Sequence, residues 1–277
     1  MTFICGDRSL DLSVPQVMGI LNATPDSFSD GGKFNSLDRA LNHASNMIAQ
    51  GASIIDVGGE STRPGATPVS LQEELDRVIP VIEKIRSQLD VCISVDSSSP
   101  EVFLAAKKAG AHLLNDVRAL TRKGALQAAQ QTGLPVCLMH MQGEPKTMQH
   151  KPSYQQVVDD VMGFLQERIA ACREAGIGNH QILIDPGFGF GKTLENNYAL
   201  LARLERFEAL QVPMLVGLSR KSMIAGVLNN ACVDDRVNGS VAGAVIATMK
   251  GAKILRVHDV KETCDALKVV QATMAQL

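Results

Sequence analysis

Short apolar runs alternate with helical patterns along most of the chain. Eight such runs lie at residues 16–21, 53–57, 91–95, 112–114, 134–139, 181–184, 213–218 and 252–255. Runs that are mainly apolar, without regular alternation, are typical of parallel strands buried on both faces. Between the runs, apolar residues recur at helical spacing, as Leu37, Leu41 and Ala44 do before Gly51. The pattern therefore predicts eight strand–helix units in succession.

Local signals predict where several of these helices begin and where one is interrupted. Ser70-Leu-Gln-Glu73 has the form of a capping box, and Ser99-Pro100 is typical of an N-cap followed by the first helical residue. Ser153-Tyr-Gln-Gln156 is expected to cap a helix that runs through Cys172. Pro80 lies inside a helical pattern, where it removes a hydrogen bond. We therefore expect a kink or an early break at Pro80.

Eight units in 277 residues, without a linker or a low-complexity segment, favour one closed architecture. We predict a single α/β domain over residues 1–277, folded as a (β/α)8 TIM barrel. Periodicity does not show closure, so a doubly wound open sheet is the alternative at this stage.

Composition narrows the function classes. The net charge of −2, the pI near 6.3 and the absence of Trp predict no general attraction to nucleic acid and no partnership with an anionic membrane. The six cysteines form no C-x-x-C pair, which is typical of a reduced, cytoplasmic protein without a structural zinc site. The stretch from Met1 to Val14 is interrupted by charges and does not have the pattern of a signal peptide.

Polar residues follow the apolar runs, and in a closed barrel they meet at one mouth. They are Asn22, Glu60–Arg63, Asp96, Asn115, His140, Asp185, Lys221, Arg256 and His258. The acceptors and donors of Asp96, Asn115, Asp185 and Lys221 suit the edge of a planar nitrogen heterocycle. Arg63, Arg256 and His258 suit phosphates. Asn22 offers a neutral oxygen of the kind that helps to hold a hydrated Mg²⁺ beside phosphates.

Several of these side chains also have an ordinary structural interpretation. Asp96 could cap the next helix, although Ser99 fits that role better. Asp185 could only form a turn before its proline. Arg256 could pair with Asp259. Convergence of all these residues at one mouth favours the functional interpretation.

Two familiar motifs are excluded. Gly187-Phe-Gly-Phe-Gly-Lys-Thr193 is not a phosphate-binding P-loop, because Pro186 stands where the first glycine is required. We interpret it as a flexible loop whose two phenylalanines can wall a pocket. His140 and His150 have no partner at metal-ligand spacing, so no zinc site is expected.

Six longer motifs carry a resemblance to a known family. They are Met18-Gly-Ile-Leu-Asn-Ala-Thr-Pro-Asp-Ser-Phe-Ser-Asp-Gly-Gly32, Ile55-Asp-Val-Gly-Gly-Glu-Ser-Thr-Arg-Pro-Gly65, Ser94-Val-Asp96, Leu183-Ile-Asp-Pro-Gly-Phe-Gly-Phe-Gly-Lys192, Ser219-Arg-Lys-Ser222 and Arg256-Val-His-Asp259. On these motifs, which span Gln16 to about Lys261, the chain resembles the dihydropteroate synthases, the folate-pathway enzymes that sulfonamides inhibit. Ala23 and Ser97 depart mildly from the family pattern, without removing a group that the chemistry needs.

The resemblance implies that a 7,8-dihydropterin bearing a methyl diphosphate condenses with 4-aminobenzoate, with Mg²⁺ as cofactor and a homodimer as the assembly. The pterin would be held by Thr62, Asp96, Asn115, Asp185 and Lys221, and the diphosphate by Arg63, Arg256 and His258. Phe28, Thr62, Pro64, Phe190, Lys221 and Ser222 would border the 4-aminobenzoate site, and Asn22 would ligate Mg²⁺. Catalytic roles would fall to Asp96, Arg63, Lys221 and Arg256.

Three alternatives stay open. One is a methyltransferase acting on methyltetrahydrofolate and a corrinoid protein; the long first motif and Arg63 argue against it, because that reaction releases no diphosphate. The second is a catalytically silent pterin-binding paralogue, and the third is a structural barrel without a ligand. The polar residues that follow the strands argue against both.

Overall fold

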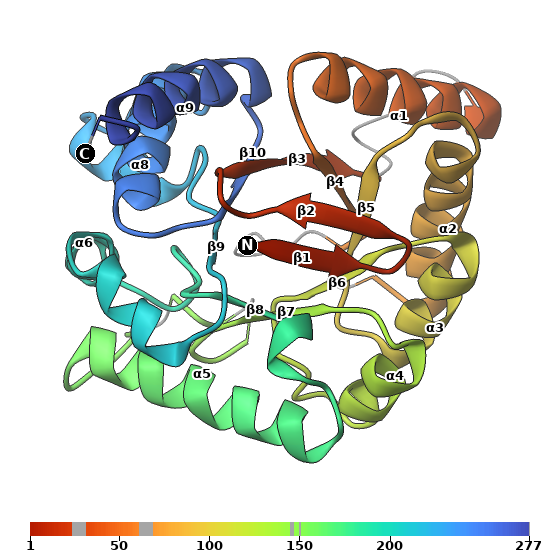
Figure 1. Cartoon of the computed structure of the whole chain (residues 1–277), viewed down its shortest axis with the longest axis horizontal. Helices are drawn as coiled ribbons and strands as arrows, with labels where there is room; N and C mark the ends of the chain where they lie inside the picture. The colour runs from red at the N-terminus through yellow and green to blue at the C-terminus, as the bar shows by residue number, and fades with distance from the viewer. Residues whose placement is uncertain (24–31, 61–68, 145–146, 150, 277) are drawn as a thin grey trace.

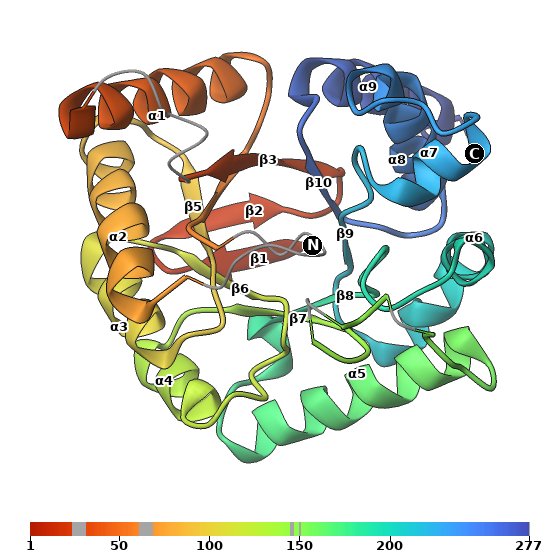
Figure 2. The ribbon, with the colours of Figure 1, turned by 180° about the vertical axis from the view of Figure 1, so that it is seen from behind.

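Eight parallel strands form the centre of the molecule, and helices surround them (Figure 1; Figure 2). The structure is a computed structural model that describes residues 1–23, 32–60, 69–144, 147–149 and 151–276. The strands are β3 Gln16–Asn22, β4 Ile54–Gly58, β5 Cys92–Asp96, β6 Leu113–Asp116, β7 Val136–Met139, β8 Ile182–Asp185, β9 Leu215–Val216 and β10 Ile254–Val257. They pair in the order β8-β7-β6-β5-β4-β3-β10-β9.

The ends of this sheet meet and close a barrel. Ile184 of β8 forms a parallel bridge with Met214, just before β9, and its amide donates to the carbonyl of Pro213 at 3.1 Å. The predicted (β/α)8 barrel is thereby confirmed, and the open-sheet alternative is wrong. The strand predicted at residues 213–218 is shorter than expected, because only Leu215 and Val216 pair as a regular ladder.

The helices cover the outside of the barrel. They are α1 Gly32–Ala49, α2 Leu71–Gln88, α3 Pro100–Ala109, α4 Ala125–Thr132, α5 Val157–Glu174, α6 Leu194–Ala202, α7 Ser222–Val227, α8 Val237–Met249 and α9 Val260–Met274. Short 3₁₀ segments lie at Asn179–Gln181, Leu204–Leu210 and Asp234–Arg236. Among the residues that the structure describes, no helix combines the length and the apolar character needed to cross a membrane.

Helix α2 contains both a confirmed prediction and a wrong one. Ser70 Oγ accepts from the amide of Glu73 at 3.3 Å, and Glu73 Oε2 accepts from the amide of Ser70 at 2.9 Å, which is the predicted capping box. The early break expected at Pro80 does not occur, because α2 continues to Gln88. Buried Val78, Val81, Ile82 and Ile85 lie on both sides of the proline. Their burial outweighs the one hydrogen bond that proline removes.

Of two other predicted caps, one is confirmed and one is wrong. Ser99 occupies the N-cap of α3 and Pro100 begins the helix, as predicted, although the Ser99 hydroxyl donates to Glu74 at 3.0 Å instead of accepting from its own helix. Ser153 does not cap α5. The carboxylate of Asp160, in the first turn, accepts from the amides of Gln155 and Gln156 instead. An acidic residue in the first turn thus supplies the acceptor that a serine was expected to supply.

A hairpin that the sequence analysis did not assign closes the amino-terminal end of the barrel. Strands β1 Thr2–Cys5 and β2 Arg8–Asp11 pair antiparallel and lie across that end, as Figure 1 shows. Phe3, Cys5, Leu10 and Leu12 pack against one inward residue from each barrel strand. Those eight residues are Met18, Ile54, Cys92, Leu113, Cys137, Leu183, Leu215 and Ile254. The bottom of the barrel is therefore filled and apolar.

The interior changes character one layer higher. Side chains alternate along a strand, so the next inward residue lies two positions further on. From Ile54, Cys92, Leu113, Leu183 and Ile254, this step leads to Asp56, Ser94, Asn115, Asp185 and Arg256. Each of these five is polar or charged, and four are buried. These five residues form a charged layer, which lies two positions further along the strands than the apolar floor.

Candidate active site

Arg256 is at the centre of the charged layer. Its Nε donates to Asp56 Oδ2 at 2.6 Å, and its Nη2 donates to Asp96 Oδ2 at 2.7 Å. Burial opposes the guanidinium charge, but the two carboxylates outweigh it and raise the pKa of Arg256. The alternative pairing of Arg256 with Asp259 is wrong, because Asp259 accepts from Arg220 instead, at 3.0 and 2.5 Å.

The surroundings of the Asp96 carboxyl group raise its pKa. Burial raises its pKa to about 7, Arg256 opposes that shift, and the neighbouring carboxylates of Asp56 and Asp116 add to it. At neutral pH both protonation states are therefore populated. The helix-capping alternative fails, because the residue at the N-cap of α3 is Ser99 and Asp96 is engaged by the arginine.

Asp56 joins this group although the sequence analysis did not select it. It is completely buried, and its Oδ2 also accepts from Asn115 Nδ2 at 3.1 Å. The search of the sequence considered residues that follow a strand, whereas Asp56 lies inside β4. The alternation of inward positions was the signal that would have found it, because Asp56 lies two residues after the buried Ile54.

Asp185 and Lys221 form the other side of the site. Burial raises the pKa of Asp185, and the charge of Lys221 opposes that shift. Burial lowers the pKa of Lys221 to about 8, and Asp185 opposes it in turn. Lys221 Nζ donates to the carbonyl of Phe188 and lies 4.4 Å from the centre of the Phe190 ring. Asp185 also accepts from the amide of Gly187 at 2.7 Å, so it forms the predicted turn as well.

The loop that follows Asp185 is fixed by its neighbours, and the expectation of a flexible loop is wrong. The carbonyls of five successive residues, from Gly187 to Gly191, each accept from a side chain. Gly187, at φ 70°, approaches His140 so closely that a Cβ there would lie 1.9 Å from its carbonyl oxygen. Both phenylalanines of the loop were expected to line a pocket. Phe188 is instead buried in the main core, whereas Phe190 lies beside Lys221.

His258 is held through its neighbour Ser219. The Ser219 hydroxyl oxygen accepts from the amide of His258 at 3.2 Å and lies 3.1 Å from its Nδ1. Ser219 is buried, whereas His258 is half-buried. The imidazole is therefore oriented by Ser219 just after the end of β10. Ser222, the first residue of α7, is exposed.

The serines that follow Asp96 donate to buried carboxylates. Ser97 donates to Glu74 Oε1 at 2.6 Å, and Glu74, on α2, is 4% exposed. Ser98 pairs with Asp116, which also accepts from the amide of Arg118 at 2.8 Å. A buried carboxylate that receives several donors holds its surroundings in one geometry. These residues carried no signal in the sequence beyond a run of three serines.

The remaining predicted residues fall into two groups. Asn22 ends β3, is exposed, and lies in register with Gly58, which itself pairs with Asp96. Phe28, Thr62, Arg63 and Pro64 lie outside the described residues. Within the described part of the chain, no group of three or more His, Cys, Asp or Glu side chains could hold a metal ion. Asn22, the predicted metal ligand, is among the described residues.

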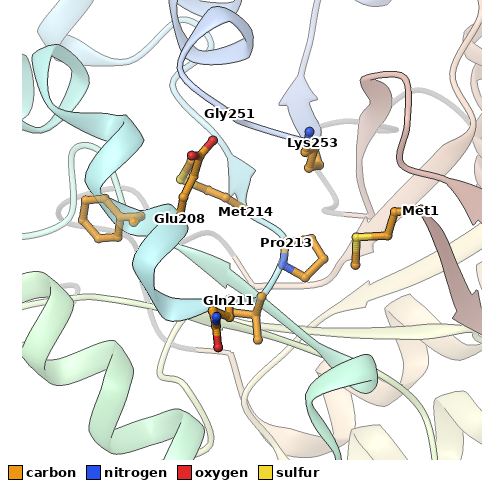
Figure 3. A pocket seen from close by; sticks show the side chains of 9 residues that line it. Met1, Glu208, Gln211, Pro213, Met214, Gly251 and Lys253 are labelled. Atoms are coloured by element: carbon orange, nitrogen blue, oxygen red, sulfur yellow. The ribbon is translucent and has the colours of Figure 1, made fainter.

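A pocket of about 230 Å³ lies at the other end of the barrel (Figure 3). Its lining includes Met1, Glu208, Pro213 and Lys253. Pro213 precedes β9 and Lys253 precedes β10, so the pocket is at the amino ends of the strands. Active sites of (β/α)8 barrels lie at the carboxyl ends. The charged layer at the mouth, and not this pocket, is the candidate active site.

Comparison with known proteins identifies similar chains. A model of the pterin binding enzyme family matches residues 18–258. The dihydropteroate synthase of Escherichia coli (strain K12) is 61% identical over 275 residues, covering 99% of this chain and 97% of the relative. A dihydropteroate synthase of Yersinia pestis, solved with a sulfonamide drug complex, superposes with a TM-score of 0.95 at 57% identity, covering 99% of this chain and 100% of the other. The Xanthomonas albilineans enzyme, solved with 7,8-dihydropteroate, has a TM-score of 0.91 at 46% identity, with 99% of both chains covered.

Proposed function

The chain belongs to the dihydropteroate synthase family of pterin-binding enzymes, and from that premise we propose which of its residues bind each substrate and which take part in the reaction. It is a pterinylmethyl transferase of folate biosynthesis. The reaction condenses (7,8-dihydropterin-6-yl)methyl diphosphate with 4-aminobenzoate and yields 7,8-dihydropteroate and diphosphate. The observation that supports the residue assignment is the charged layer in which Arg256 joins Asp56 and Asp96.

We assign the pterin to Asp96, Asn115, Asp185 and Lys221, with Thr62 beside them. A pterin presents N–H donors on its pyrimidine edge, and it presents a carbonyl and ring nitrogens as acceptors. Buried acceptors at Asp185 and Asn115 match the donors, and the ammonium of Lys221 matches an acceptor. Buried polar groups reject a ligand that leaves them unpaired, so this set supports recognition of one heterocycle.

We assign the diphosphate to Arg63, Arg256 and His258. Arginine donors and an oriented imidazole suit phosphate oxygens. We also propose that Asn22 contributes to a Mg²⁺ site. A single neutral side-chain oxygen fits this ion, since Mg²⁺ commonly keeps several waters and takes its other ligands from substrate phosphates. When bound, the ion supplies positive charge to the diphosphate.

The catalytic roles of Asp96, Arg63, Lys221 and Arg256 follow from the bond that breaks. The C–O bond to the diphosphate breaks, the electron pair leaves with the diphosphate, and a methylene cation conjugated with the pterin ring remains. Carboxylates at Asp96 and Asp185 stabilise a ring that is becoming positive. The amine nitrogen of 4-aminobenzoate then forms the new C–N bond and releases its proton afterwards. No nucleophilic side chain is needed.

We place 4-aminobenzoate at the rim, next to Phe190, Lys221 and Ser222, with Phe28, Thr62 and Pro64 as further neighbours. The support within the described residues is that the Phe190 ring lies 4.4 Å from Lys221 Nζ and that Ser222 is exposed beside it. The relative from Yersinia pestis was solved with a sulfonamide drug complex. We therefore also propose that sulfonamides compete for this part of the mouth.

We propose that the chain forms a homodimer through α8. This helix is apolar on more than one side: Ala244 and Ala247 are buried, whereas Ile246 is 41% and Met249 is 64% exposed. A helix that is apolar all round is usually covered on all sides. A second copy of the chain is the partner that would cover the outer face.

We propose a cytoplasmic location. All six cysteines are free thiols, and five of them are buried. Free thiols persist in a reducing compartment, whereas extracellular proteins usually oxidise theirs.

Diphosphate release tests the assignment. Purified protein is supplied with the pterin diphosphate and Mg²⁺, with and without 4-aminobenzoate. Release that depends on 4-aminobenzoate and yields dihydropteroate is the expected result. Binding of the pterin without any release would point to a silent pterin-binding protein, or to a methyltransferase that is then tested by methyl transfer.

A further inference from the structure

Asp56 joins the proposed diphosphate site to the proposed pterin site within the charged layer. Its carboxylate is completely buried in β4, and a single oxygen, Oδ2, receives Arg256 Nε at 2.6 Å and Asn115 Nδ2 at 3.1 Å. The arginine belongs to the proposed diphosphate site, and the asparagine belongs to the proposed pterin site. One buried oxygen therefore holds a residue of each.

The Asn115 contact fixes which way its amide points. An oxygen that already accepts from Arg256 acts as an acceptor, so the asparagine must turn its NH₂ group toward Asp56. The carbonyl oxygen of the same amide, Oδ1, is then the atom that Asn115 can offer to a ligand. Reversing the amide would place two oxygens against each other in a buried position, which is costly.

We propose that Asp56 is a positioning residue that sets the Asn115 amide as an acceptor toward the pterin, and so determines which heterocycle edge the site takes. The inference rests on the proposed function, in which Asn115 lies against the pterin. Asp56 itself does not touch the substrate. It selects a ring that presents an N–H donor to Asn115 and disfavours a ring that presents a lone pair at the same place.

Two substitutions of similar size at position 56 test this role. Asp56→Asn keeps the acceptor, because its amide oxygen can take the place of Oδ2 and accept from Arg256 and Asn115 as before, while its NH₂ group takes the place of Oδ1, which has no hydrogen-bond partner among the described residues. Asp56→Leu removes the acceptor, so the Asn115 amide is no longer held with its NH₂ group toward position 56. Both variants remove the same charge.

Cys92 provides the matched control. It lies in β5, opposite Ile54 of β4, and it is buried in the apolar floor below the charged layer. Cys92→Ala therefore perturbs the interior of the barrel without touching the charged layer.

The experiment is calorimetric titration of each variant with 6-hydroxymethyl-7,8-dihydropterin, which lacks the diphosphate and so reports the pterin site alone. We expect Asp56→Leu to weaken binding roughly ten- to hundredfold, Asp56→Asn to keep most of the wild-type affinity, and Cys92→Ala to bind like the wild type. Equal losses in Asp56→Leu and Asp56→Asn would overturn the proposal, because the charge and not the accepting oxygen would then matter.

Asn115→Asp alone gives a second test that leaves position 56 unchanged. It keeps an acceptor toward the ligand but sets two carboxylates against each other. We expect it to bind the pterin at least about tenfold more weakly than the wild type, and wild-type affinity would overturn the proposal. A wild type that does not bind this pterin would instead contradict the placement of the pterin in the charged layer.

Discussion

Lys192 Nζ lies 2.9 Å from His140 Nδ1, and both residues are buried beside the mouth of the barrel. The same nitrogen donates to the carbonyls of Gly187 at 2.8 Å and Phe190 at 3.0 Å. Three acceptors match the three donors of an ammonium group. Lys192 thus joins the end of β7 to the loop after β8, which carries Asp185.

Removing this ammonium leaves buried acceptors without donors. We expect Lys192→Met to lower the free energy of unfolding by about 2–4 kcal/mol, measured by urea denaturation. The control is Lys250→Met, which removes a partly exposed ion pair with Glu205 and is expected to cost less than about 1 kcal/mol. Equal losses in the two variants would show that Lys192 does not hold the loop.

His140 should make the protein sensitive to acid. Burial, reinforced by the charge of Lys192, lowers its pKa from 6.5 to about 3. The unfolded chain therefore binds a proton between these values that the folded chain does not bind. Stability is unaffected above pH 6.5 and is lost as the pH falls toward 3, by about 2 kcal/mol at pH 5. Urea denaturation across this range should show a flatter profile for His140→Asn. An unchanged slope would contradict the assignment.

Turnover should rise with pH through the titration of Asp96. Its pKa is raised to about 7, and the ionised form is the one that stabilises a cationic ring. We expect kcat to increase between pH 6 and pH 8 and the increase to vanish in Asp96→Asn. That variant should lose about 10²–10³ in kcat and much less in pterin affinity. Equal losses in kcat and affinity would assign Asp96 to binding alone.

The hairpin at the bottom should contribute stability without affecting turnover. Phe3 is 1% exposed, and its neighbour Ile4, on the opposite face of β1, is 53% exposed. We expect Phe3→Ala to cost about 3–5 kcal/mol in unfolding free energy, and Ile4→Ala to cost less than about 0.5 kcal/mol. Below the melting temperature, kcat of both variants should equal that of the wild type. A large drop in kcat for Phe3→Ala would link the hairpin to the mouth.

Assembly through α8 can be tested with a charge on its outer face. We expect Ile246→Asp to shift the protein from dimer to monomer in sedimentation equilibrium, because an unpaired charge in an apolar interface is strongly unfavourable. The control is Val14→Asp, which should stay dimeric. Val14 is 40% exposed and lies between β2 and β3. A dimer that survives Ile246→Asp would place the interface elsewhere.

Much of the architecture could be predicted because strands buried on both faces form short, mainly apolar runs, and most of these runs end where a polar residue begins. The ends themselves placed Asp96, Asn115, Asp185 and Arg256 correctly at one mouth. The hairpin escaped prediction because four-residue strands with alternating exposure are too short to show a period.

What could not be predicted were contacts between residues far apart in the chain. Arg256 and Asp56 are separated by 200 positions, and only closure of the barrel brings them together. The order of the loop after Asp185 depends likewise on donors from four different places, including Gln149 and Tyr154. Local patterns report propensity and period, whereas these partners are set by the tertiary structure.

The apolar floor beneath the charged layer has a consequence for how this enzyme can change. Buried charges at the mouth reduce stability, and substitutions there will often reduce it further. The hairpin and the eight residues that it covers lie at the opposite end, where packing can be improved without contact with substrate. Compensating substitutions should therefore collect near Phe3 and Leu10, so that one end of the barrel provides mutational tolerance for the other.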